Sequence, residues 1–97
     1  MSGSYDYFLM EKKRRGYNRL FHDLDLKSFL YPLIFERMDK ILDRLEPLER
    51  EVIDKFYFEN KTMEQISGPI SILPSTAETI KKRALEKIKS VYNLHLI

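Results

Sequence analysis

The chain contains no cysteine, and only three glycines and four prolines occur among its 97 residues. Without cysteine it can form neither a disulfide framework nor a thiolate metal site, which suits a reducing compartment. Gly3, Gly16 and Gly68 are isolated, so the sequence has no glycine-rich loop for phosphate binding. His22 and His95 lie far apart and no HExxH-like spacing occurs, which argues against a zinc site. We therefore expect no metal and no cofactor.

Long apolar runs are also lacking. No stretch approaches the roughly 18–20 apolar residues that a transmembrane helix needs. The segment from Met1 to Asp6 does not have the basic-then-apolar order of a signal peptide. We expect an intracellular, cytoplasmic protein without a membrane partner.

Charge is distributed unevenly along the sequence. Residues 1–20 hold five basic side chains against two acidic ones, and residues 79–97 hold five against one. Residues 36–54 hold seven acidic side chains against four basic ones. This asymmetry can leave one face for phosphates and another for a different partner, although solvated helix faces are the simpler explanation. The carboxylates have helix-surface spacing and basic neighbours, which favours ion pairs over acid–base catalysis, so we do not expect an enzyme.

Apolar periodicity predicts an all-α fold. Residues 5–24 show helical spacing with an interruption at Gly16, and a second helix is predicted from near Ser28–Pro32 to Leu45. Pro47 suits the first position of a third helix. The predicted apolar stripe of this helix consists of Leu48, Val52, Ile53, Phe56 and Tyr57. We expect two of the three consecutive rings at 56–58 to lie in the core.

The remaining segment has the order of a helix-turn-helix. Thr62 is predicted to cap a short helix that runs through about Ser67, before Gly68-Pro69. The sequence Ser75-Thr76-Ala77-Glu78 is a capping-box pattern that opens a last, basic helix running to about Tyr92. In a helix-turn-helix the final helix enters the DNA major groove.

The spacing of the last helix separates a buried face from an outward one. The predicted buried stripe consists of Ala77, Ile80, Ala84 and Ile88, with Leu85 beside it. Small or polar residues in the first turn can approach base edges, while Lys82 and Arg83 can reach phosphates. The predicted DNA-binding residues are Thr62, Ser75, Thr76, Glu78, Thr79, Lys82 and Arg83. An ordinary amphipathic terminal helix is the alternative interpretation.

The segment from Leu45 to Ile88 resembles the fourth, promoter-reading region of bacterial sigma factors. The motifs that carry this resemblance are Glu49-Arg50-Glu51-Val52-Ile53, Thr62-Met63-Glu64-Gln65-Ile66, Ser75-Thr76-Ala77 and Arg83-Ala84-Leu85-Glu86-Lys87-Ile88. Within this superfamily, residues 56–61 and 70–72 look most like the RinA/ArpU-type late-gene activators of phages that infect Gram-positive bacteria. The resemblance implies a small helical domain with a C-terminal, sigma region-four-like helix-turn-helix. It also implies a location in the cytoplasm of a bacterial host cell.

The sequence departs from the family pattern in two places. Sigma factors usually carry Leu-Gly-Ile-Ser in the turn, whereas this chain has Ile70-Ser71-Ile72-Leu73, so we expect a remodelled turn. Sigma factors often present Arg at the base-reading positions, and here the matching positions hold Pro74, Ser75, Glu78 and Thr79. Arginine-to-guanine readout is not available there, so the bound sequence should differ from a promoter −35 element.

We predict a sequence-specific transcriptional regulator of phage or mobile-element late-gene type, an activator that binds double-stranded DNA. Two alternatives remain: a sigma-like module that binds RNA polymerase through its acidic middle, and a phage DNA-packaging adaptor (a small terminase subunit). Residues 32–97 are expected to form the DNA-binding domain. Residues 1–31, rich in aromatic groups, are expected to form a helical arm that binds a partner or folds back. Host RNA polymerase and a second copy of the chain are the candidate protein partners.

Overall fold

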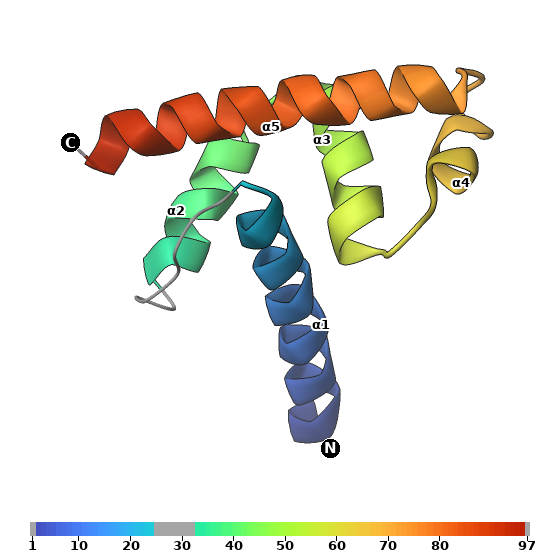
Figure 1. The fold of residues 1–97 in the computed structure, drawn as a ribbon. Helices are drawn as coiled ribbons and strands as arrows, with labels where there is room; N and C mark the ends of the chain where they lie inside the picture. The colour runs from blue at the N-terminus through green and yellow to red at the C-terminus, as the bar shows by residue number, and fades with distance from the viewer. Residues whose placement is uncertain (1, 25–32, 97) are drawn as a thin grey trace.

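The computed structural model describes residues 2–24 and 33–96 (Figure 1). These residues form helices and no strand, so the predicted all-α fold is confirmed. The elements are α1 (Ser2–Asp23), α2 (Leu33–Leu42), α3 (Pro47–Ile53), the π-helix η1 (Asp54–Phe58), α4 (Met63–Ser67) and α5 (Pro74–Leu96). None of the helices in the described segments is both long and apolar enough to cross a bilayer.

The long helix α5 runs along one side of the molecule, and α2, α3 and α4 pack against it (Figure 1). Its buried face agrees with the predicted stripe, because Ala77, Ala84 and Ile88 are fully buried. Ile80 and Leu85 are half-buried. These buried side chains therefore determine the orientation of α5. The opposite face of its first turns is exposed to solvent.

The second half of α1 belongs to the same apolar core as α2, α3 and α5. The buried members of this core are Tyr17, Leu20, Phe21, Leu24, Met38, Ile41, Leu42, Ile53, Tyr57, Ala84 and Ile88. The apolar side chains of residues 17–24 therefore fold back onto η1 and the core that it shares with α2 and α5. The predicted start of the second helix, near Ser28–Pro32, lies outside the described residues, as do the side chains of residues 2–9.

The predicted C-terminal ends of two helices are wrong. The second helix was expected to reach Leu45, but α2 ends at Leu42. Tighter turns finish it: the N–H of Arg44 donates to the carbonyl of Ile41 at 3.0 Å, and that of Leu45 to Leu42 at 3.1 Å. The last helix continues to Leu96, beyond the expected end at Tyr92. Leu48, predicted in the apolar stripe of α3, is 41% exposed because it lies in the first turn of that helix.

The predicted interruption at Gly16 is also wrong, since α1 is continuous through this residue. Gly16 is buried against the ring of Phe58, and a Cβ atom added to it would lie 2.3 Å from the Phe58 Cδ1 atom. The same ring meets Tyr17 edge-on, with centroids 5.0 Å apart. Glycine is needed here for the close approach of η1 to α1, and its cost in helix propensity is offset by this packing.

Polar contacts reinforce the junction between α1 and η1. The Tyr57 hydroxyl donates to Asp23 Oδ2 at 2.6 Å, and Arg19 donates to the Tyr57 carbonyl. Burial, together with the hydrogen bond to Asp23, raises the pKa of Tyr57 far above its ordinary value. Tyr57 is fully buried, and its neighbours Phe56 and Phe58 pack against the core while half-buried. Two of the three rings were expected in the core, but Tyr57 alone is buried there, and Phe56 and Phe58 pack against it.

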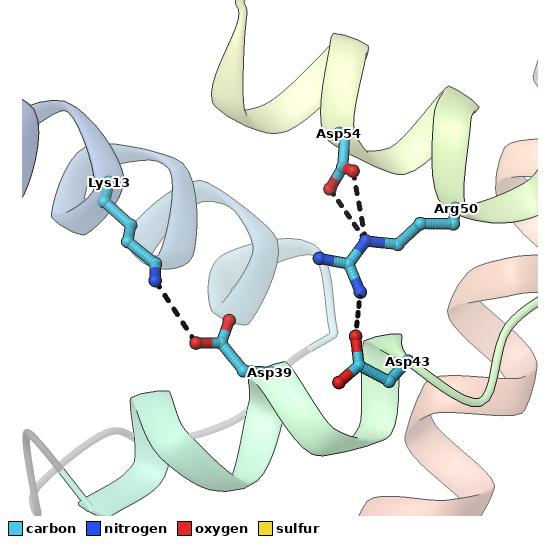
Figure 2. A network of polar contacts seen from close by, with 5 residues as sticks. All are labelled: Lys13, Asp39, Asp43, Arg50 and Asp54. Atoms are coloured by element: carbon cyan, nitrogen blue, oxygen red, sulfur yellow. Dashed lines mark hydrogen bonds and ion pairs between the residues drawn. The ribbon is translucent and has the colours of Figure 1, made fainter.

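Figure 2 shows the ion pairs that connect α1 to α2, and α3 to η1 and to the turn after α2. Arg50 Nε donates to Asp54 Oδ2 at 3.0 Å, and its Nη1 donates to Asp43 Oδ1 at 2.8 Å. Burial lowers the pKa of Arg50, but the hydrogen bonds to Asp54 and Asp43 outweigh it and raise this pKa. Lys13 on α1 pairs with Asp39 on α2 at 3.2 Å. These contacts join segments that the apolar core already brings together.

Gly16→Ala should destabilise the protein. The added methyl group overlaps the Phe58 ring, and overpacking of this kind costs about 1–3 kcal/mol, more than the roughly 1 kcal/mol that alanine gains in helix propensity. The measurement is a urea titration followed by far-UV circular dichroism. Combining Gly16→Ala with Phe58→Leu provides the control, because the smaller side chain leaves room for the methyl group. Equal destabilisation by Gly16→Ala in the two backgrounds would contradict the assigned packing.

Candidate nucleic-acid interface

The first helix of the helix-turn-helix begins as the sequence predicts. Thr62 precedes α4, and its Oγ1 accepts a hydrogen bond from the Gln65 N–H at 3.2 Å. The Gln65 side chain in turn accepts from the Thr62 N–H at 2.9 Å, which completes a capping box. The buried residues Ile66 and Ser67 lie on α4, which packs against α5. The Thr62 side chain remains exposed at the helix start.

The turn between α4 and α5 keeps a left-handed residue without a glycine. Ser71 has a φ of 57°, a backbone conformation that glycine adopts at much lower cost. Ser71 occupies the place of glycine in the usual Leu-Gly-Ile-Ser turn. Its N–H donates to the Gly68 carbonyl at 3.1 Å, and the Ile72 N–H donates to the Ser67 carbonyl at 3.2 Å. The chain therefore makes a hydrogen-bonded turn at the expense of local backbone strain.

Helix α5 begins two residues earlier than an N-cap at Ser75 predicts. Its first residue is Pro74, and the Ala77 N–H donates to the carbonyl of Leu73 at 3.0 Å. Proline suits the first helical position because its fixed φ is helical and no N–H is left unpaired. The expected capping box that starts at Ser75 is therefore wrong. Ser75 lies in the first turn, where its carbonyl accepts a hydrogen bond from the Thr79 hydroxyl at 3.0 Å.

The predicted contact residues of α5 lie together on its outward side. Five of them are exposed: Ser75, Thr76, Thr79, Lys82 and Arg83. Their spacing of three, four and seven residues places them on one side of the helix. Lys82 and Arg83 make no ion pair within the described segments. This surface offers hydroxyl groups near the helix start and two positive charges one turn later.

Glu78 differs from the other predicted contacts because it is half-buried. Lys81 Nζ lies 3.0 Å from its Oε1 atom and also 4.5 Å from the centroid of the Phe56 ring. The lysine is therefore held by a carboxylate and an aromatic face together. A base that hydrogen-bonds to Glu78 has to compete with Lys81.

Leu73 is a surface feature that the periodicity did not reveal. It precedes α5 and is 67% exposed. Because it lies four residues before the buried Ala77, helical spacing alone would have placed it on the buried stripe. The helix begins after Leu73, and so its side chain escapes that face. The proline at position 74 was the available signal.

Glu49 connects α3 to the second half of α5 through Lys87. This buried carboxylate accepts hydrogen bonds from Lys87 Nζ at 3.0 Å and from the Glu46 N–H at 3.1 Å. Burial raises the pKa of Glu49, but the hydrogen bonds from Lys87 and Glu46, with the charges of Lys87 and Arg83, outweigh it. The pKa of Glu49 is therefore lowered from its ordinary value, 4.5.

Most carboxylates of the acidic middle segment are used inside the molecule. Five of the seven acids in residues 36–54 form ion pairs: Asp39, Asp43, Glu49, Glu51 and Asp54. The acidic residues of this segment are thus better explained as members of ion pairs than as a free acidic surface for a partner. Among the described residues, no group of three or more acidic or histidine side chains could hold a metal ion.

Comparison with known families agrees with this geometry. The family model described as sigma-70, region 4 matches residues 41–90, just over half of the chain. The chain belongs to the sigma-70 region 4 family. Members of this family are DNA-binding helix-turn-helix domains of regulatory proteins, not enzymes. No curated protein matches the chain, and no solved structure does either.

Ser71→Gly should stabilise this region-four domain. Glycine removes the cost of the left-handed conformation, which is about 1 kcal/mol. Part of this gain in folding free energy is lost because glycine also gives the unfolded chain more conformational entropy. We expect a higher urea midpoint. Ser71→Ala is the control, because alanine has no advantage at positive φ. A gain of the same size in both variants would show that backbone strain is not the cause.

Glu49→Gln should lower the free energy of unfolding at neutral pH, and it should lower it much less in acid. A lowered folded-state pKa means that the ionised carboxylate contributes stability above about pH 4.5, which is lost as the pH falls through that lowered pKa. The loss at pH 7 should be about 1–2 kcal/mol, since Lys87 is itself half-exposed. Urea titrations between pH 3 and pH 7 measure it. Glu51→Gln, whose carboxylate is far more exposed than that of Glu49, should cost only a few tenths of a kcal/mol. A pH-independent difference for Glu49→Gln would refute the assignment.

Proposed function

We propose that this protein is a sequence-specific transcriptional regulator that inserts the first turns of α5 into the DNA major groove. The observation that carries the proposal is the row of exposed hydroxyl and basic side chains on α5, directly after the turn that follows α4. Family membership supports DNA binding by the helix-turn-helix as such.

The proposed contacts divide by chemistry. Ser75, Thr76 and Thr79 come closest to base edges, where hydroxyl groups can pair with several bases. The side chains of Lys82 and Arg83 reach phosphates. Thr62 lies at the start of the helix that crosses the DNA backbone in this motif. These contacts set register and affinity, and the hydroxyl groups of the first turn contribute base preference.

Two further side chains modulate base preference in this proposal. Glu78 accepts a hydrogen bond from cytosine N4 only when Lys81 moves away from it, because the two are ion-paired in the free protein. Leu73, exposed at the start of α5, can contact the methyl group of thymine. Neither offers bidentate guanine recognition, so we propose a site unlike a −35 element.

We further propose an activator of phage or mobile-element late-gene type in the cytoplasm of a bacterial host. The support is the similarity of residues 56–61 and 70–72 to RinA/ArpU-type regulators. The alternative of a polymerase-binding module with an acidic surface is less favoured, because most acids of the middle segment are paired within the molecule.

Residues 1–31 are proposed as a partner-binding arm. Figure 1 shows the first turns of α1 extending beyond the other helices, and Met10 is 71% exposed. A helix-turn-helix monomer reads few base pairs, so a second copy of the chain or RNA polymerase would add specificity. We favour self-association, in which the core-forming residues 17–24 fix the direction of the arm.

Replacing Lys82 and Arg83 together by Ala should weaken binding to every DNA sequence. Each lost phosphate contact should reduce the slope of log K against log salt by about 0.9. The measurement is fluorescence anisotropy with a duplex of random sequence at several salt concentrations. The pair Lys40→Ala on α2 and Arg44→Ala in the turn after it is a matched control, because these residues are also exposed and carry the same charge. Equal loss in the two double variants would remove α5 from the phosphate interface.

A further inference from the structure

The basic cluster of α1 divides into two faces in the structure. Lys13 pairs with Asp39 on α2, and Arg14 pairs with Glu11 on α1 itself. Lys12 and Arg15 are exposed and make no ion pair within the described segments. The four consecutive basic residues look equivalent in the sequence. In the structure, Lys13 and Arg14 are ion-paired, whereas Lys12 and Arg15 are not.

The two uncompensated charges lie on the face of α1 that meets the loop before α4. Lys12, Arg15 and Arg19 are spaced by three and four residues and so share one face of the helix. Arg19 donates to the carbonyl of Tyr57 and to Asn60 Oδ1. This face of α1 is therefore tied to the chain segment that enters the helix-turn-helix.

An open groove of about 460 Å³ runs between this face and the loop. Its lining residues are Lys12, Arg15, Asn18, Arg19, Phe58, Glu59 and Asn60. Glu59 is the acidic member, and Lys61 lies 3.3 Å from it in an ion pair. The groove thus carries a net positive charge, with Asn18 as an exposed hydrogen-bonding group at its edge.

The groove is close in the chain to Thr62, which is a proposed DNA contact. Asn60 precedes Thr62 by two residues, a separation of at most about 7 Å along the chain. Asn60 adopts a left-handed conformation, with a φ of 57°, and its side chain is held by Arg19. A duplex strand whose backbone passes Thr62 would have its neighbouring phosphates near the groove.

We propose that the groove between α1 and the 58–60 loop is a second DNA-backbone contact, in which Lys12 and Arg15 bind phosphates. The inference rests on the proposed function, because Thr62 and α5 place the duplex. It adds a clamp outside the helix-turn-helix. The contact is electrostatic and independent of sequence, so it raises affinity without changing base preference.

The test compares two double variants of the full chain on a random-sequence duplex of about 30 base pairs. Lys12→Ala with Arg15→Ala removes the proposed contact, and Lys13→Ala with Arg14→Ala removes the same charge one position away. We expect the first pair to reduce the salt slope by roughly 1.8 units, about 0.9 for each phosphate. The second pair should change it little, because Lys13 and Arg14 are already paired with Asp39 and Glu11 and do not line the groove.

A third variant, Lys12→Arg with Arg15→Lys, keeps both charges and should retain the wild-type slope. Circular dichroism checks that all variants fold, as expected for exposed positions. Equal slopes for the two alanine pairs would overturn the second contact while leaving α5 in place, provided that the Lys82 and Arg83 variant still loses affinity. If that variant also binds like wild type, the proposed function itself fails.

Discussion

Helix α5 is held by a buried apolar face in which two of the residues are small. Ala77 and Ala84 are fully buried, and α2, α3 and α4 all pack against this helix. A small side chain lets two helix backbones approach, so the position of α5 depends on residues that contribute little area themselves. Larger side chains at these positions would push α4 or α3 outward and alter how the outward face meets DNA.

Several features of the fold follow from the sequence because local chemistry determines them. The Thr62 cap, the helix that starts at Pro47 and the buried stripe of α5 were all predicted. Each depends on residues within one or two turns, where capping and periodicity are strong. The family could be inferred for the same reason, since its motifs lie inside these elements.

Other features could not be predicted because their causes lie far along the chain. The continuity of α1 through Gly16 depends on Phe58, whose ring fills the space that a side chain would occupy. The left-handed Ser71 is set by the turn, against the preference of serine. The candidate site was predicted as a set of outward residues, but the pairing of Glu78 with Lys81 depends on rotamers that a sequence pattern does not encode.

The length of α5 has a consequence for how the molecule unfolds. At 23 residues it extends over about 35 Å, and it is shared by two groups of buried side chains. Ala77 is buried near its start, where α5 also packs against α4, whereas Ala84 and Ile88 join the core that includes α1 and α2. Unfolding of either end of α5 therefore destabilises the packing at the other end. The domain should unfold as one cooperative unit. A ligand that orders the first turns of α5 would slow the opening of the distant core as well.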